Sequence, residues 1–165
     1  MNYTFQFGQV TGQLPYLLGG ALVTLEIALV AFWAGAVIGL LGALGKSFGP
    51  AWVRRLIDAY VIAFTNTPAL VQIFFLVYAL PEAGILLPHM TAVLIGLTLN
   101  SGAYLTEIQR AGFLSVRRTE IEAAETLGMS RLQSLRYVIL PHIAKTLFAP
   151  LANFFVWIVL GSSMA

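Results

Sequence analysis

The feature that most constrains this chain is a series of long apolar stretches that carry almost no charge. A helix needs about 20 mostly apolar residues to cross the hydrocarbon core of a membrane. Residues 59–81, 88–106 and 146–165 contain no Asp, Glu, Lys or Arg, and residues 14–45 contain only Glu26. Because that core offers backbone groups no water, all four stretches are predicted to be helices. We therefore expect an all-α, polytopic transmembrane bundle.

The overall composition agrees with this class. The 165 residues are 59% hydrophobic and 10% charged, whereas soluble domains carry about 25% charged residues. A chain without cysteine has neither a disulfide framework nor a thiolate metal site, and no other metal cluster is expected. We interpret residues 1–165 as a single transmembrane domain. Because residue 165 ends an apolar stretch without a charged flank, a further C-terminal span is expected.

The basic residues predict the orientation of the spans. Cytoplasmic loops of membrane proteins carry an excess of Lys and Arg. All nine basic residues of this chain fall in two of its loops, after the first span and after the third. They are Lys46, Arg54 and Arg55 in the first loop, and Arg110, Arg117, Arg118, Arg131, Arg136 and Lys145 in the second. The N-terminus is therefore predicted to lie outside, and both loops in the cytoplasm.

The second basic loop, residues 107–145, is too long to be a plain connection and should have structure of its own. Thr119 and Glu122 have the spacing of a capping box at a helix start, as do Ser130 and Gln133. Gly128 lies between them, where a left-handed backbone commonly ends a helix. The pattern predicts two short helices joined by a tight turn, the second stopped or kinked by Pro141.

Two interpretations of this helix pair differ in the partner they imply. A helix-turn-helix that binds DNA needs a basic recognition face. The first helix instead carries three glutamates, and both helices are tethered between membrane spans. The alternative is a docking helix whose alanines, Ala123 and Ala124, allow a cytoplasmic protein to approach closely. We favour the docking helix, and no nucleic-acid partner is expected.

One pattern in this loop resembles the EAA signature of permease subunits of ATP-binding-cassette (ABC) importers. Its elements here are Glu122-Ala123-Ala124, then Gly128, then Val138-Ile139-Leu140-Pro141. Where the signature normally has isoleucine, Val138 lacks one methylene and remains apolar. The resemblance implies a type I importer fold with a cytoplasmic coupling helix. It implies that the residues that couple the chain to an ATPase are Thr119, Glu122, Ala123, Ala124, Gly128, Leu140 and Pro141.

The flanking spans resemble the polar amino-acid permeases, of the histidine and glutamine importer type. The resemblance rests on Leu99-Asn100-Ser101-Gly102-Ala103-Tyr104 and on Thr67-Pro68-Ala69-Leu70-Val71-Gln72. Family members often have Arg-Gly where Thr65-Asn66 stand here, which leaves the substrate open. The resemblance implies partner ATPase subunits that hold ATP and Mg, a second permease subunit and an external binding protein. It implies amino-acid transport across the bacterial cytoplasmic (inner) membrane, with no cofactor and no catalysis on this chain.

A few polar residues within the predicted spans are candidates for a substrate path. Glu26 is an intramembrane carboxylate, which is costly and a candidate for function. The others either line a path or join helices by hydrogen bonds. They are Thr67, Gln72, Asn100 and Ser101.

Two residue pairs predict structural contacts. Gly35 and Gly39 have the small-xxx-small spacing of a close helix contact. Glu107 and Arg110 are three residues apart, the spacing of a helical ion pair.

Two other functions remain open on the residues alone. A secondary transporter driven by an ion gradient would be expected to carry several intramembrane ionisable groups as a relay, whereas here only Glu26 is present. A membrane anchor that recruits a cytoplasmic protein would need the docking helix but no path. Dependence of transport on a partner ATPase separates the three.

Overall fold

The computed structural model describes residues 12–163, and these residues form helices joined by short turns, with no strand among them. The predicted all-α fold is confirmed. Residues 1–11, which include the N-terminus predicted to lie outside, and the last two residues of the predicted fourth span are not in the described part. The elements are α2 (Leu14–Phe48), α3 (Ala51–Thr65), α4 (Ala69–Phe74), a π-helical turn η1 (Phe75–Ala79), α5 (Leu80–Glu82), α6 (His89–Leu114), α7 (Arg118–Thr126), α8 (Arg131–Ser134), a second π-helical turn η2 (Leu135–Ile139) and α9 (Leu140–Ser162).

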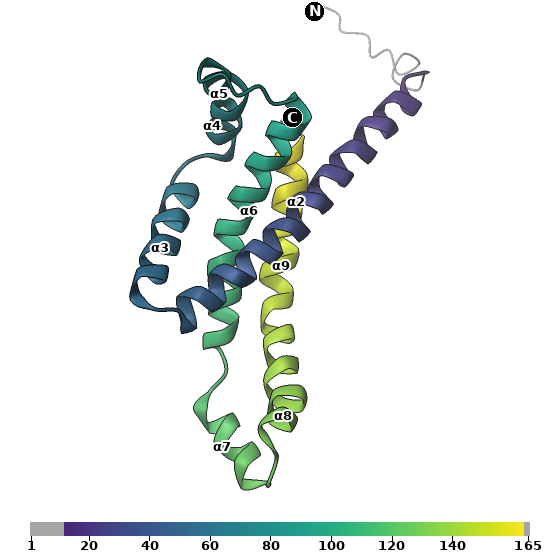
Figure 1. Cartoon of the computed structure of the whole chain (residues 1–165). Coiled ribbons are helices and arrows are strands. Elements are labelled where there is room, and N and C mark those ends of the chain that lie inside the picture. The colour runs from purple at the N-terminus through teal and green to yellow at the C-terminus, as the bar shows by residue number, and fades with distance from the viewer. Residues whose placement is uncertain (1–11, 164–165) are drawn as a thin grey trace, which may run out of the picture.

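Helix α6 lies at the centre, with α2 crossing it, α9 beside it and α3 and α4 along its other side (Figure 1). The crossing of α2 and α6 depends on small residues. A Cβ at Gly35 would lie 2.5 Å from the Ser101 Cβ, and one at Gly39 would lie 2.7 Å from the Leu105 Cβ. The predicted close contact through the two glycines is therefore confirmed, because any larger residue would push the helices apart.

The apolar core lies where α2, α6 and α9 meet. Leu97 and Leu105 of α6 and Ile158 of α9 are almost completely buried. Phe154 of α9 packs on Tyr104 of α6, with ring centroids 5.6 Å apart. The first half of α2 extends beyond this contact, away from the other helices (Figure 1).

The predicted continuous span over residues 59–81 is wrong. This segment consists of α3 and the helical stretch Ala69–Glu82, which meet at a bend of 99°. The break falls at Pro68, whose ring disfavours the helical conformation at Thr67 and which has no N–H to donate. Within residues 12–163, two continuous helices are long and apolar enough to cross a membrane, Leu14–Phe48 and Arg131–Ser162, and the bent pair counts as a third if it is one span.

The predicted span over residues 88–106 lies within α6, which continues eight residues further, to Leu114. With 26 residues, α6 is long enough to cross a membrane, but it is not among the helices apolar enough to do so, and its buried face includes polar groups. Asn100, Ser101, Thr106 and Gln109 are all buried against neighbouring helices. The central helix is therefore also the most polar of the long ones.

Of the two effects predicted for Pro141, a stop or a kink, the stop is wrong. One helical rod runs from Arg131 to Ser162 through α8, η2 and α9. Just before the proline, the Leu140 N–H donates to the Leu135 carbonyl, five residues back instead of four. Because the hydrogen bonds of this π-type turn reach back five residues, the helix accommodates Pro141, which has no N–H to donate, and continues past it.

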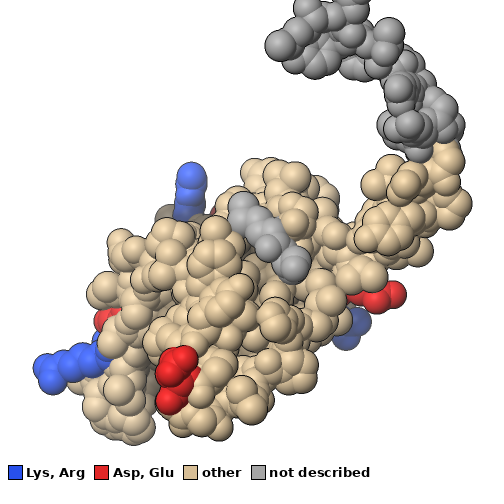
Figure 2. All heavy atoms as spheres, turned by 90° about the horizontal axis from the view of Figure 1, so that it is seen from above, with Lys and Arg blue, Asp and Glu red and all other residues tan. Residues whose placement is uncertain are grey.

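Charged side chains join three helices at the end of the bundle nearest α7. The Lys46 Nζ lies 2.6 Å from the Asp58 Oδ1 and 2.5 Å from the Glu107 Oε1. The Arg110 Nη2 lies 3.1 Å from the Glu107 Oε2, which confirms the predicted helical ion pair. The cluster ties α2, α3 and α6 together. The opposite end of the molecule shows few charged side chains (Figure 2).

Candidate functional site

The break between α3 and α4 gathers three of the predicted path residues. A helix end leaves its last carbonyls without intrahelical partners, and a membrane supplies no water to satisfy them. The Gln72 Nε2 donates to the carbonyls of Phe64 and Thr67, both at 2.9 Å. The Asn100 Nδ2 donates to the Phe64 carbonyl at 3.3 Å and to the Gln72 Oε1 at 3.2 Å. An amide pair from two helices thus caps the end of α3.

The remaining carbonyls at the end of α3 are also bonded by side chains. Because these donors come from the break itself and from α6, the bend is held by hydrogen bonds as well as by the proline. The bonds run from Asn66 Nδ2 to the Ile62 carbonyl at 2.8 Å, from Thr67 Oγ1 to the Ala63 carbonyl at 2.8 Å, and from Tyr104 Oη to the Thr65 carbonyl at 3.1 Å.

A pocket of about 260 Å³ opens beside this capped end. Asn100 lines it and is only 1% exposed, yet its Oδ1 has no hydrogen-bond partner among residues 12–163. Tyr104 and Trp157 form an aromatic wall, with ring centroids 5.9 Å apart. The lining residues are Thr65, Asn66, Thr67, Pro68, Ala69, Asn100, Tyr104 and Trp157. We call this the break pocket; it brings together the Asn100 amide, the backbone at the end of α3 and two aromatic side chains.

Two predicted path residues lie elsewhere. Ser101 is on the face of α6 that packs against Gly35 of α2, and its Oγ is buried without a hydrogen-bond partner among residues 12–163. Glu26 is exposed on α2, next to the buried Ile27 and Ala28, so it faces away from the bundle. The structure thus brings Thr67, Gln72 and Asn100 together and leaves these two apart.

The predicted coupling segment forms a separate unit at the far end of the molecule, where α7 projects from the long helices (Figure 1). Gly128 adopts a φ of 72°, as its sequence position predicts. The Gly128 N–H donates to the Glu125 carbonyl, and the Met129 N–H donates to the Ala124 carbonyl. This pair of bonds is the Schellman motif, which ends a helix with a left-handed residue. Glycine there fixes the direction in which the chain leaves α7.

The predicted capping box at Thr119 is wrong. The N-cap of α7 is Arg117, two residues before the predicted cap Thr119. No side-chain cap bond is found there within the described residues. Glu122 instead pairs with Arg118, at 2.9 Å between Oε1 and Nε. The second predicted box is confirmed, because Ser130 and Gln133 cap each other across the start of α8.

The surface of α7 differs from the symmetrical pair of alanines that the sequence suggests. Ala123 is exposed, whereas Ala124 is only 2% exposed. Leu127 and Leu132, on either side of the turn, are 80% and 73% exposed. A contiguous exposed apolar patch is typical of an interaction surface. We call Ala123 and these two leucines the docking surface, after the docking role that the sequence predicts.

Contacts also connect the docking surface to the long helices. The Glu120 Oε2 of α7 lies 3.2 Å from the His142 Nδ1 of α9. Leu140 and Pro141, which complete the predicted motif, are exposed on the rod that α9 continues. Any displacement of α7 would therefore act on α9 at its base.

Some residues of these sites have no signal in the sequence. Tyr104 and Trp157 belong to the break pocket but read as ordinary aromatic residues of apolar helices. Lys46 and Asp58 form the charge cluster at the ends of three helices, and only their tertiary neighbours reveal the pairing. Their residue types alone do not show which partners they contact.

Known proteins resemble this chain along nearly its whole length. Residues 35–165 match the family model described as binding-protein-dependent transport system inner membrane component. The probable amino-acid ABC transporter permease protein YckA of Bacillus subtilis is 37% identical over 164 residues, which are 99% of this chain and 73% of that protein. The glutamine transport system permease protein GlnP of Escherichia coli is 34% identical over 157 residues, 94% of this chain and 71% of that protein.

A solved structure described as an amino acid ABC transporter with histidines superimposes with a TM-score of 0.87 at 31% identity, covering 98% of this chain and 76% of that one. A methionine ABC transporter in an inward-facing conformation has the same fold, with a TM-score of 0.68 at 22% identity over 92% of this chain and 73% of that one. The family match, the close relatives and the shared architecture lead to one conclusion. This chain belongs to the family of binding-protein-dependent transport system inner membrane components.

Proposed function

We propose that this chain is the permease subunit of an ABC importer that carries amino acids across the bacterial inner membrane. It works with separate ATPase subunits that bind ATP and Mg, with a second permease subunit and with an external binding protein. The observation that carries this proposal is the docking surface, in which Ala123, Leu127 and Leu132 are exposed beyond the long helices. A permease with no phosphate-binding loop of its own must receive the energy of hydrolysis through such a surface.

Coupling follows from how α7 is attached. The Schellman turn at Gly128 sets its angle at one end, and the Glu120–His142 contact joins it to α9. When the ATPase subunits close, they displace α7, and the rod from Arg131 to Ser162 transmits the displacement to the bundle. The amino acid must bind differently in the two resulting states, because a ligand shifts an equilibrium only by its differential affinity.

The break pocket is the proposed substrate path. The α-ammonium group of an amino acid is a cation that donates hydrogen bonds. The carbonyls at the C-terminal end of α3 give that side of the pocket a partial negative charge. The aromatic faces of Tyr104 and Trp157 add attraction for a cation. Glu26 and Ser101, the other two predicted path residues, lie outside this pocket.

The coupling proposal is tested on the permease assembled with its ATPase. Gly128→Asp forces a charged side chain into a left-handed backbone at a helix end, and we expect loss of ATPase association or of substrate-stimulated ATP hydrolysis. Gly128→Asn is the matched control, because asparagine tolerates the left-handed conformation better than other residues with a side chain, and it should retain more coupling. Normal association and wild-type uptake by Gly128→Asp would reject the docking surface.

The path proposal is tested by Trp157→Ala in the same complex. The concentration of amino acid that gives half-maximal uptake should rise by about 2- to 30-fold, as expected for loss of a cation–π contact. Trp52→Ala, at an exposed position on α3 outside the pocket, serves as the control. An unchanged concentration dependence would remove Trp157 from the path. Uptake driven by a proton gradient without the ATPase would instead favour a secondary transporter.

A further inference from the structure

We infer that the groove between α2 and α9 binds an anionic phospholipid, with one acyl chain in the groove and the phosphate at Lys145. The groove has a volume of about 550 Å³ and lies apart from the break pocket. Every residue of its lining is apolar, and four are aromatic. They are Leu29, Phe32, Trp33, Ala144, Leu147, Phe148, Leu151, Ala152 and Phe155. We call this the lipid groove.

One end of the lipid groove is closed within the bundle. Phe32 of α2 and Phe155 of α9 meet edge to face, with ring centroids 5.3 Å apart. Beyond them the two helices stay together, since the Ser162 Oγ donates to the Thr24 carbonyl at 3.2 Å. An occupant therefore enters from the other end, at Ala144, which is the end nearest α7.

The length of the groove fits one leaflet of a membrane. Ten residues separate Phe155 from Lys145, and at a rise of about 1.5 Å per residue they span about 15 Å. Half of the hydrocarbon core, about 30 Å thick in all, is the same length. A single acyl chain laid along α9 thus reaches from mid-membrane to the headgroup region.

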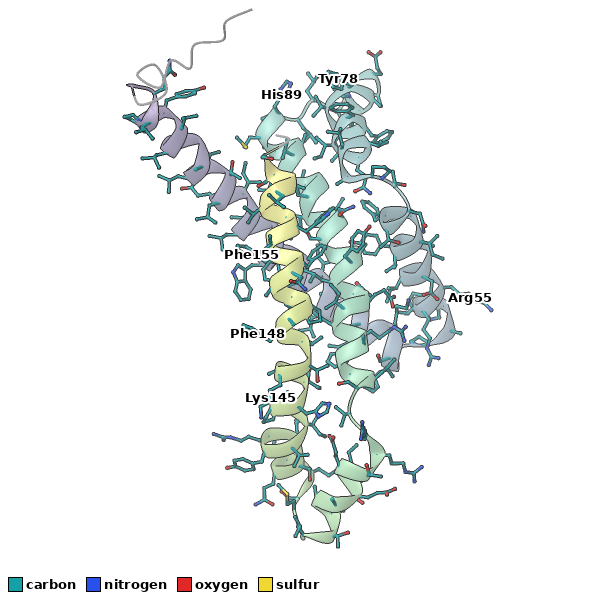
Figure 3. The ribbon with its side chains drawn as sticks, turned by 180° about the vertical axis from the view of Figure 1, so that it is seen from behind. Arg55, Tyr78, His89, Lys145, Phe148 and Phe155 are labelled. Atoms are coloured by element: carbon teal, nitrogen blue, oxygen red, sulfur yellow. The ribbon has the colours of Figure 1, made fainter. Side chains whose placement is uncertain are left out.

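The charges along the groove select the headgroup. Lys145 is exposed and forms no ion pair with any residue between 12 and 163. Figure 3 shows Lys145, Phe148 and Phe155 along one edge of α9. Among acidic residues, Glu26 is the nearest in sequence to the lining of the groove. It lies three residues before Leu29, toward the closed end. Glu120, an acid at the open end, is held against His142. A phosphate is therefore attracted to Lys145, and a long lysine side chain can reach from helix to headgroup.

A phospholipid fits the lipid groove better than a protein helix does. The lining offers no hydrogen bond that would fix a helix in register, whereas a flexible acyl chain needs none. The unpaired lysine at the open end fits a headgroup phosphate, and the predicted cytoplasmic side of the membrane carries the anionic lipids. A second copy of the chain, or another segment, is the alternative occupant that the experiment must detect.

The test places a photoreactive benzoylphenylalanine at Phe148 in the full chain, reconstituted in phosphatidylethanolamine vesicles with a minority of phosphatidylglycerol. Mass spectrometry identifies what is captured. We expect phosphatidylglycerol adducts in excess of its share of the bilayer. The same probe at Val156, which is exposed on α9 outside the groove, should capture both lipids in their bulk proportion.

Lysine variants then test the charge. Lys145→Gln should lower the phosphatidylglycerol excess by about fivefold, the factor for one basic residue at an anionic surface. Lys145→Arg should preserve it, and Arg131→Gln, an exposed cation on the same rod, should not change it. Because Lys145 is exposed, the variants should elute from size exclusion like the wild-type chain. Capture of a polypeptide, or an excess unaffected by Lys145→Gln, would overturn the inference.

A second measurement needs no change at the lysine. Brominated phosphatidylglycerol quenches tryptophan fluorescence on contact, and Trp33 lies in the groove. We expect quenching that saturates at low phosphatidylglycerol, and loss of that saturable part in Trp33→Phe. Quenching that rises in simple proportion to lipid content would contradict a site.

Discussion

Two prolines of this chain, Pro68 and Pro141, have opposite effects on the helix around them. At Pro68 the chain turns through 99° between α3 and α4. At Pro141 the helix continues without a break from Arg131 to Ser162. The residue type is the same, so the proline alone does not decide the outcome. What differs is how the backbone groups around each proline are satisfied.

At Pro141 the backbone hydrogen bonds are made within the same helix. Pro141 has no N–H to donate, and the residue before it, Leu140, donates to the Leu135 carbonyl in a π-type bond. The same bond pattern, from the Leu80 N–H to the Phe75 carbonyl, precedes Pro81. At Pro68 the carbonyls are capped from outside the helix, by Gln72 and by Asn100 of α6. A helix in a membrane breaks only where neighbouring groups donate hydrogen bonds to its free carbonyls.

The largest effect is expected from removing those outside donors. Gln72→Leu and Asn100→Leu each leave buried carbonyl or amide groups unpaired, which costs about 1–3 kcal/mol in the free energy of unfolding. Because the two side chains bond to each other, the double variant should cost less than the two single changes together. Unfolding in detergent, followed by circular dichroism, measures all three.

Asn153→Leu serves as the control for this series, because Asn153 is exposed on α9. Its stability should change little. If Asn100→Leu were as mild as this control, the amide pair would not be what holds the break.

Replacing Pro141 by alanine should change geometry more than stability. Alanine restores an N–H, so the π turn can revert to an α-helix and rotate α8 by about 100° relative to α9. Spin labels at Glu125 on α7 and Asn153 on α9 would report the change as a shifted distance distribution. An unchanged distance would mean that η2 is held by its surroundings and not by the proline.

Two single substitutions compare the helix caps predicted at Ser130 and Thr119. Ser130→Ala removes a cap that the structure contains, and it should cost about 1 kcal/mol. Thr119→Ala removes a residue that caps nothing within the described chain, and it should change stability by less than about 0.5 kcal/mol. Equal losses in thermal unfolding would contradict the position of the α7 start.

Pro68→Ala is also expected to have a small effect on stability. If the outside donors hold the bend, alanine leaves it in place and destabilises the protein by only about 0.4–1 kcal/mol, through the freer unfolded chain. Spin labels at Ala59 on α3 and Val77 beyond the break measure the angle. A straightened helix would show that the proline, and not the amide pair, makes the break.

Much of this architecture could be predicted from local sequence. Apolar stretches of sufficient length predicted helices within residues 14–45 and 146–165, and the helices α2 and α9 cover most of both. Gly128 was predicted to be left-handed because little else allows such a turn at a helix end. Gly35 and Gly39 predicted a close helix contact because four-residue spacing places both on one face. In each case the determining residues lie within one or two turns of one another.

The tertiary structure alone decided where the second span breaks and what the polar residues do. Asn100 reaches the Phe64 carbonyl across 36 positions of sequence, and Tyr104 reaches Thr65 across 39. Ser101 and Asn100 are neighbours in sequence, yet one packs against α2 and the other caps α3. Hydrophobic patterns record only whether a side chain avoids water. Which donor satisfies which carbonyl in a membrane depends on helices that meet only after folding.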